Sequence, residues 1–242
     1  MKIYGLIGKS LSHSFSKKFF EKKFLLEKIE AEYLNFELQD IKECKDLFKK
    51  PNLAGLNVTI PYKQEIIPFL DELSTEAKTI NAVNTISLKD GKLIGYNTDA
   101  FGFQQSIKPF LTFKHERAMI LGSGGASLAI EYVLKNLGID IIRISRNPKG
   151  EKQFSYSQIN NHMMNACKLI VNCTPVGTFP NIDEVVDLPY EFFTDEHLAV
   201  DLIYNPEKTQ FLKKAEQNGA SILNGESMLK NQALEAYRIW NS

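Results

Sequence analysis

The segment that most constrains the fold is a run of small residues, Gly122-Ser123-Gly124-Gly125-Ala126-Ser127. An apolar, strand-like stretch at 117–121 leads into it, and a helix-like stretch at 126–137 leaves it. Small residues in that context let main-chain N–H groups approach a pyrophosphate, and the helix N-terminus favours its negative charge. The alternative is a glycine-rich turn that binds nothing. The context favours a nucleotide-binding Rossmann half with parallel strands.

The rest of the chain alternates between strand and helix patterns, which predicts an α/β layer architecture. Asp90-Gly91 separates two strand-like segments and supplies the positive φ values of a tight hairpin. We expect strands at 2–7, 33–38, 55–60, 85–89, 92–96, 117–121, 140–145, 169–172, 198–201 and 221–223, and helices at 16–27, 44–49, 63–69, 126–137 and 227–240.

The charge balance and the apolar content of the chain limit the kinds of protein that it can be. The 242 residues carry 29 Lys and Arg against 29 Asp and Glu, so net charge favours neither nucleic acid nor an anionic membrane as a partner. No apolar run approaches the roughly 20 residues of a membrane helix, and the N-terminus does not resemble a signal peptide. We therefore expect a cytoplasmic protein with reduced thiols and no metal. Its cysteines stand at 44, 167 and 173 and its histidines at 13, 115, 162 and 197, without metal-ligand spacing.

The end of the second Rossmann strand indicates which dinucleotide is bound. An NAD site usually places an acidic residue there to hold the ribose 2′-hydroxyl. Here the strand ends in Ser145-Arg146-Asn147 with Lys149 close by, and Asp140 lies at its other end. A guanidinium can bind a 2′-phosphate through two hydrogen bonds. The sequence favours NADP, with a merely solvated Arg146 as the alternative.

Several short motifs occur in an order that resembles the shikimate dehydrogenase family over almost the whole chain. They are Asn-Val-Thr-x-Pro-x-Lys at 57–63, Ala-Val-Asn-Thr at 82–85, Asn-Thr-Asp-x-x-Gly at 97–102, the glycine-rich loop at 122–126, Asn-x-Thr-Pro-x-Gly at 172–177, Asp-x-x-Tyr-x-Pro at 201–206 and Gly-x-x-Met-Leu-x-x-Gln-Ala at 225–233. The N-terminal motif keeps Ser14-Phe15-Ser16 but has Ser10 and Lys17 where the family usually has prolines. It also has Phe19-Phe20 in place of a His-Asn pair.

The resemblance implies two domains and a set of site residues. A substrate-binding domain would comprise 1–98 and 226–242, and an NADP-binding domain 99–225. The substrate, shikimate or 3-dehydroshikimate, would be bound by Ser14, Ser16, Thr59, Lys63, Asn84, Asp99, Tyr204 and Gln232. The cofactor would be bound by Gly122, Gly124, Gly125, Ala126, Ser127, Arg146, Asn147, Thr174 and Gly225. Taken singly, Ser14 and Ser16 are also compatible with helix caps and Asn84 with a turn residue, but the ordered set favours the substrate site.

Lys63 and Asp99 are the expected catalytic pair. Reduction of the ketone places negative charge on oxygen, which an adjacent ammonium stabilises and can protonate. Asp99 would orient Lys63 and accept from a substrate hydroxyl, and its charge favours the charged lysine. That suits ketone reduction better than shikimate oxidation, so the sequence leaves open which residue moves the proton. An ordinary surface salt bridge is the plainer alternative.

The implied function is NADP-dependent shikimate dehydrogenase, in the biosynthesis of chorismate and the aromatic amino acids, working as a monomer or homodimer. A quinate/shikimate dehydrogenase using NAD is one competitor, and Ser16 and Arg146 speak against it. A non-catalytic NADP-binding regulator is another, and the retention of Lys63 with Asp99 speaks against that.

Overall fold

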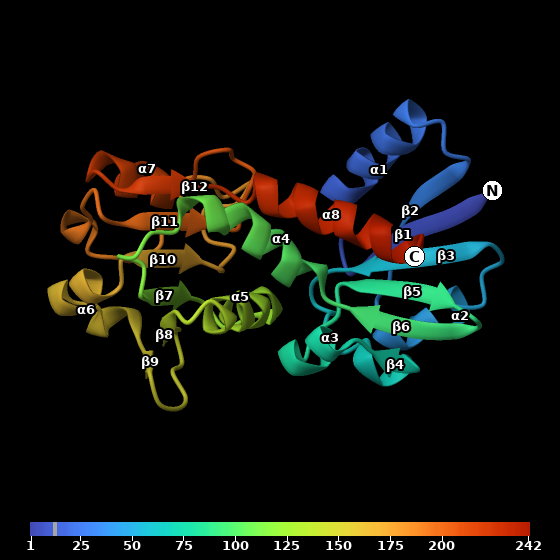
Figure 1. The fold of residues 1–242 in the computed structure, drawn as a ribbon, viewed down its shortest axis with the longest axis horizontal. Helices are drawn as coiled ribbons and strands as arrows, with labels where there is room; N and C mark the ends of the chain where they lie inside the picture. The colour runs from blue at the N-terminus through green and yellow to red at the C-terminus, as the bar shows by residue number, and fades with distance from the viewer. Residues whose placement is uncertain (12–13) are drawn as a thin grey trace. The chain divides into compact units, whose positions relative to one another are not determined.

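The computed structural model describes residues 1–11 and 14–242, and the chain forms two compact units (Figure 1). The first unit comprises Met1–Thr98 together with Ala233–Ser242, and the second comprises Asp99–Gln232. Each unit contains one six-stranded sheet. The last helix, Glu226–Trp240 (α8), crosses the limit between the units, so the chain returns to the first unit for its final residues.

The sheet of the first unit is mixed, in the order β2-β1-β3-β5-β6-β4. Its first three strands are parallel to one another, whereas β5 runs antiparallel to both β3 and β6. Asp90 and Gly91, at φ 52° and 75°, make the turn between β5 and β6 as the sequence predicts. The elements of this unit are β1 (Lys2–Gly8), α1 (Phe15–Leu26), β2 (Ala31–Glu37), η1 (Ile41–Glu43), α2 (Cys44–Leu47), β3 (Leu53–Val58), η2 (Ile67–Phe69), β4 (Glu72–Leu73), α3 (Thr75–Ile80), β5 (Thr85–Lys89) and β6 (Lys92–Tyr96).

The end of α8 is anchored on the sheet of the first unit. The Trp240 indole N–H donates to the Ile86 carbonyl oxygen at 3.0 Å, and its ring stacks on Tyr4 with centroids 4.7 Å apart. A Cβ on Gly55 would lie 2.4 Å from the same indole, so only glycine leaves room for it. Because these contacts are aromatic and buried, the last turns of α8 belong to the core of this unit.

The sheet of the second unit is entirely parallel, in the order β12-β11-β10-β7-β8-β9. This is the doubly wound Rossmann order, in which the direction of winding reverses between β7 and β10. The fold class is therefore the predicted one. The elements are α4 (Thr98–Ile107), η3 (Lys108–Phe110), β7 (Arg117–Leu121), α5 (Gly125–Asn136), β8 (Asp140–Ile144), β9 (Gln153–Phe154), η4 (Tyr156–Gln158), α6 (Asn161–Ala166), β10 (Leu169–Asn172), η5 (Tyr190–Phe192), β11 (Leu198–Asp201), α7 (Gln210–Gln217) and β12 (Ser221–Leu223).

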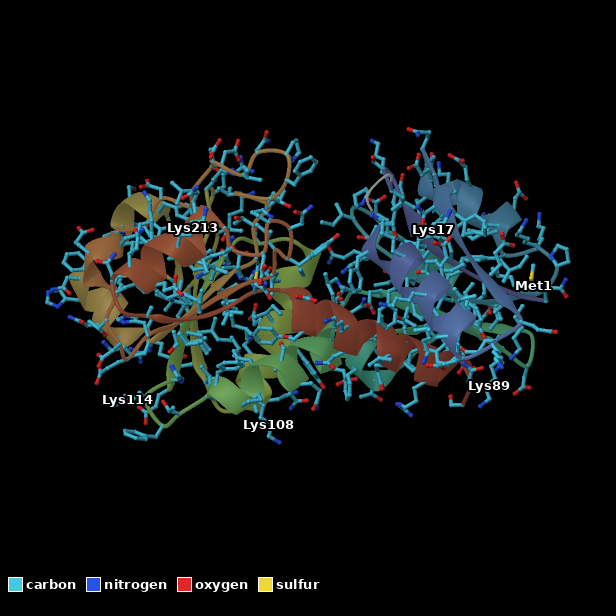
Figure 2. All side chains as sticks on the ribbon, turned by 90° about the horizontal axis from the view of Figure 1, so that it is seen from above. Met1, Lys17, Lys89, Lys108, Lys114 and Lys213 are labelled. Atoms are coloured by element: carbon cyan, nitrogen blue, oxygen red, sulfur yellow. The ribbon has the colours of Figure 1, made fainter. Side chains whose placement is uncertain are left out.

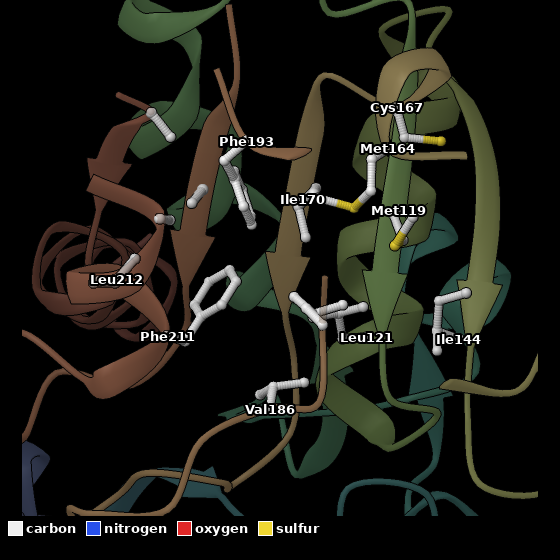
Figure 3. Packing of buried hydrophobic residues seen from close by; sticks show 14 residues of the cluster. Met119, Leu121, Ile144, Met164, Cys167, Ile170, Val186, Phe193, Phe211 and Leu212 are labelled. Atoms are coloured by element: carbon white, nitrogen blue, oxygen red, sulfur yellow. The ribbon is translucent and has the colours of Figure 1, made fainter. Parts of the chain in front are cut away.

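Apolar side chains cover both faces of this parallel sheet. Figure 3 shows one side, where Met119, Ile170 and Phe211 come together from β7, β10 and α7. The strand residues Leu169–Asn172 and Leu198–Asp201 are all buried. In the sequence, buried parallel strands are continuous apolar runs, and their limits can therefore be predicted closely.

The predicted helix at 63–69 is wrong. The segment forms a series of turns and then the short helix η2, with Pro68 in its first turn. Proline has no N–H to donate and disfavours helical geometry in the residue before it, so a regular helix cannot run through this position. The strand predicted to end at Ile60 ends at Val58, two residues earlier.

The surface carries charge of both signs. The lysines labelled in Figure 2 come from different elements of both units, among them Lys89 on β5, Lys114 before β7 and Lys213 on α7. Within the described ranges, no helix is long and apolar enough to cross a membrane.

Candidate active site

The turn that carries Lys63 is fixed by its main chain. Thr59 follows β3, and its N–H donates to the carbonyl oxygen of Ile7 at the end of β1, at 2.8 Å. The Lys63 carbonyl accepts from the N–H of Val83 at 2.7 Å, which brings the turn beside the Ala-Val-Asn-Thr segment. The Lys63 side chain is half-buried. The structure therefore brings Thr59, Lys63 and Asn84 to one edge of the first sheet, where the sequence places them only by resemblance.

Asn84 links that edge to the start of α4. Its side-chain oxygen accepts from the N–H of Thr98 at 2.7 Å, and its amide nitrogen donates to the Thr98 hydroxyl at 3.0 Å. The side chain is 3% exposed. Thr98 precedes Asp99 directly, so Asn84 fixes the main chain from which the candidate catalytic carboxylate begins.

A buried polar network lies beneath this edge and is missed by the sequence analysis. The Tyr33 hydroxyl donates to the side-chain oxygen of Asn57 at 2.8 Å. The amide nitrogen of Asn57 donates onward to the Asn84 carbonyl and to the Thr85 hydroxyl, at 3.2 and 3.1 Å. Burial raises the pKa of Tyr33 well above its usual range, and the nearby Ser16 hydroxyl opposes that rise. Asn57 belongs to the first motif, but no sequence spacing points to Tyr33.

The two serines of the N-terminal motif have different local roles. Ser14 is the N-cap of α1, where its hydroxyl oxygen accepts from the N–H of Lys17 at 3.2 Å. A capping oxygen still has its own proton to donate, so capping and carboxylate binding are compatible. Ser16 is buried in the first turn of the helix. His13 lies outside the described residues.

The glycine-rich loop has the geometry of a phosphate cradle. Gly122 has φ +103°, and a Cβ there would lie 3.0 Å from the Thr174 Cγ2, so the first position requires glycine. Gly124 is the N-cap of α5 and has no side-chain cap, and a Cβ there would meet nothing within 4 Å. Gly125 and Ala126 form the first turn of α5. Exposed main-chain N–H groups at a 12-residue helix N-terminus fit the pyrophosphate of a dinucleotide.

Ser127 stabilises the glycine-rich loop through a hydrogen bond inside it. It is fully buried, and its hydroxyl donates to the Gly124 carbonyl oxygen at 2.7 Å. That bond closes the turn on which the loop depends. Ser127 is also small enough for α5 to pack closely on β7 and β8, as the third position of a dinucleotide fingerprint requires.

Arg146 and Asn147 are exposed and follow β8 directly, after the buried Ser145. Among the residues that the structure describes, Arg146 makes no ion pair, so its guanidinium is available to an anion. Asp140 begins β8 and is held there by Arg117 at 3.1 Å and Lys152 at 2.7 Å. These partners keep the pKa of Asp140 below its usual value. Asp140 is thus at the opposite end of the strand from a ribose site, as the sequence indicates.

The motif residues Asn172 and Asp201 end the neighbouring strands β10 and β11. The Asn172 side-chain oxygen accepts from the N–H and the hydroxyl of Thr174, at 3.0 and 2.6 Å. Its amide nitrogen donates to Asp201 at 3.1 Å. Both motifs are recognisable in the sequence, but the sequence alone indicates no role for these two residues. Their side chains hold the loop that carries Thr174.

Four further predicted residues, Asp99, Tyr204, Gly225 and Gln232, lie on the second unit. Asp99 is in the first turn of α4 and is 7% exposed. A Cβ on Gly102, one turn later, would lie 3.0 Å from Gln232, so glycine there lets α4 and α8 approach closely. Tyr204 is half-buried after β11, and burial raises its pKa. Gly225 packs against the main chain of Leu202, where a Cβ would come within 2.1 Å of the carbonyl oxygen.

The last candidates to consider are metal-ligating groups and reactive cysteines. The described residues include no group of His, Cys, Asp and Glu that could hold a metal. The three cysteines are free, and burial raises the pKa of Cys44 to about 11, of Cys167 to about 12 and of Cys173 further still. The thiols are therefore protonated at neutral pH and poor nucleophiles.

Comparison with known proteins bears directly on this arrangement. Residues 6–86 match the family model of the shikimate dehydrogenase substrate binding domain. The chain is 36% identical to the NADP(+) shikimate dehydrogenase of Pyrococcus abyssi, over 99% of this chain and 92% of that one. It is 34% identical to its counterpart from Methanosphaera stadtmanae, over 98% and 90% of the two chains. The shikimate 5-dehydrogenase of Thermus thermophilus, solved with NADP(H) and shikimate, is 30% identical with a TM-score of 0.87, covering 99% of this chain and 93% of that one.

Proposed function

The chain belongs to the shikimate dehydrogenase family, and we infer that it catalyses the reversible reduction of 3-dehydroshikimate to shikimate with NADPH. The observation that carries this inference is similarity over nearly the full length to NADP-dependent enzymes. The glycine-rich loop and the exposed Arg146 support the same cofactor. The activity is that of an oxidoreductase in the biosynthesis of chorismate and the aromatic amino acids.

We propose that the first unit binds the substrate and the second the cofactor, with the domain limits at 1–98 and 226–242 and at 99–225. The substrate would be held by hydroxyl and amide groups from Ser14, Ser16, Thr59, Asn84 and Gln232, with Tyr204 beside them. The buried network of Tyr33 and Asn57 supports this, because it fixes the main chain of Asn84 with a hydrogen bond that needs no ligand.

The cofactor would be held by Gly122, Gly124, Gly125 and Ala126 at the pyrophosphate, and by Arg146 and Asn147 at the 2′-phosphate. Ser127, Thr174 and Gly225 complete the site. When bound, NADPH supplies the hydride. What the chain itself contributes is main-chain N–H donors at the α5 N-terminus and a guanidinium with no competing carboxylate beside it in the described structure.

Lys63 and Asp99 carry the proton chemistry in this proposal. As hydride reaches the carbonyl carbon, negative charge develops on oxygen, and the Lys63 ammonium stabilises that charge and donates a proton. Asp99 orients the ammonium and accepts from a substrate hydroxyl. In the oxidative direction the same proton returns, through either residue. We propose that the enzyme works in the cytoplasm, as a monomer or homodimer.

The decisive experiment follows absorbance of the reduced cofactor with shikimate or quinate and NADP or NAD, in all four pairings. We expect turnover with shikimate and NADP to exceed the other three pairings clearly. Preference for quinate with NAD would identify the competing dehydrogenase activity. No turnover in any pairing, with NADP still bound, would leave a non-catalytic NADP-binding protein.

A further inference from the structure

Asp201 is a fully buried carboxylate at the carboxyl end of β11, and three donors converge on it. The Asn172 amide nitrogen and the Ile203 N–H reach its Oδ1, at 3.1 and 3.0 Å. The Thr209 hydroxyl reaches its Oδ2 at 2.6 Å. No cation is among these partners. The carboxylate therefore acts as an acceptor that joins segments of main chain.

Each of the three donors belongs to a different structural feature. Asn172 uses its side-chain oxygen to hold the N–H and the hydroxyl of Thr174. The carbonyl of Ile203 accepts from the N–H of Gly225 at 3.0 Å. Thr209 is the N-cap of α7. Asp201 is thus the common partner of the loops that carry Thr174 and Gly225.

Those loops have little freedom to move on their own. The Thr174 Cγ2 would lie 3.0 Å from a Cβ on Gly122, so it packs against the first glycine of the phosphate loop. Gly225 sits against the Leu202 carbonyl oxygen with no room for a side chain. A shift of Asp201 would therefore displace both loops, including the Thr174 side chain that packs against the glycine-rich loop.

We propose that Asp201 is a positioning residue for the dinucleotide, holding Thr174 and Gly225 in the arrangement that binds it. This inference rests on the proposed function, because it assigns those two residues to the cofactor site. Asp201 is fully buried, and it acts through Asn172 and Ile203. Burial raises the pKa of this carboxyl to about 6, so ionisation at this position carries a cost in the folded state.

The test compares Asp201→Ala with Asp201→Asn by calorimetric titration with NADP⁺ and, separately, with shikimate. For Asp201→Ala we expect the Kd for NADP⁺ to rise about ten-fold, as for one lost hydrogen bond, and the Kd for shikimate to stay within about two-fold. Asp201→Asn retains an oxygen for Asn172 and Ile203 and can donate to Thr209. Its Kd for NADP⁺ should therefore stay close to that of the unmodified chain.

A folded Asp201→Ala that binds NADP⁺ normally would overturn the inference, and so would equal losses for NADP⁺ and shikimate. If Asp201→Ala does not fold, Asn172→Ala decides the question. It removes the acceptor for Thr174 while Asp201 keeps Ile203 and Thr209, and we expect the same selective loss of NADP⁺ binding. Failure of the unmodified chain to bind NADP⁺ would instead overturn the proposed function.

Discussion

The carbonyl oxygen of Lys63 accepts a hydrogen bond of 2.7 Å from the N–H of Val83. The bond joins the turn after β3 to the segment that leads into β5, and it uses only main-chain atoms. This bond holds the main chain of the turn at Lys63 without using the lysine side chain. Substitutions there can change the chemistry of the ammonium while leaving the turn intact.

We expect Lys63→Met to lower kcat by roughly two to four orders of magnitude, the usual contribution of a positioned acid or base. The Kd for shikimate should change much less, because the ammonium matters most when charge develops on oxygen. Steady-state kinetics and calorimetry measure the two quantities, with the exposed Lys78→Met on α3 as control. Near-normal kcat with lost binding would assign Lys63 to substrate positioning instead.

Ser14→Ala should both destabilise the protein and weaken shikimate binding. Loss of the cap on α1 costs about 1 kcal/mol of unfolding free energy. Loss of a hydrogen bond to the substrate carboxylate should raise KM for shikimate roughly ten- to a hundred-fold. Ser16→Ala should raise KM similarly.

Ser74→Ala is the matched control for Ser14→Ala. Ser74 caps α3 in the same unit and accepts from the N–H of Ala77 at 3.1 Å, but it belongs to no site motif. We expect it to lower Tm and leave KM unchanged. If Ser14→Ala behaves in the same way, its hydroxyl is a cap alone.

Arg146→Ala should raise KM for NADP roughly ten- to a hundred-fold, the range for lost hydrogen bonds to a charged group. KM for NAD, which lacks the 2′-phosphate, should hardly change. Lys152→Ala is the control, because that exposed lysine pairs with Asp140 near the start of β8. Equal losses with both cofactors would exclude a contact between Arg146 and the 2′-phosphate.

Stability should depend on pH through Asp201. Its folded-state pKa is raised from 3.8 to about 6, so between these values the folded state binds more protons than the unfolded state. The free energy of unfolding therefore falls by about 3 kcal/mol in all as the pH rises through that window. Asp201→Asn should be more stable than the unmodified chain at pH 7, and the difference should shrink towards pH 4. Urea unfolding of both proteins at several pH values measures this. A difference independent of pH would mean that Asp201 is not the titrating group.

The sequence predicts best those helices and strands that are specified by residues adjacent in the chain. The strands at Arg117–Leu121, Leu169–Asn172 and Leu198–Asp201 match their predicted limits because each is a short apolar run with a polar end. The helix predicted at 63–69 failed because one proline outweighed a favourable composition. The helices α3, α4, α6 and α7 went unpredicted. In α3 and α6, six residues carry too little periodicity to stand out.

The sequence alone determined the fold class, the glycine-rich loop and the order of the motifs, because each depends on residues adjacent in the chain. Only the tertiary structure showed that Tyr33 and Asn57 support Asn84, and that Asp201 supports Thr174 and Gly225. These partners are far apart in sequence and are joined by hydrogen bonds in buried surroundings. The folded chain requires such bonds, because burying a polar group without a hydrogen-bond partner costs free energy. No local pattern reveals which distant residue will satisfy them.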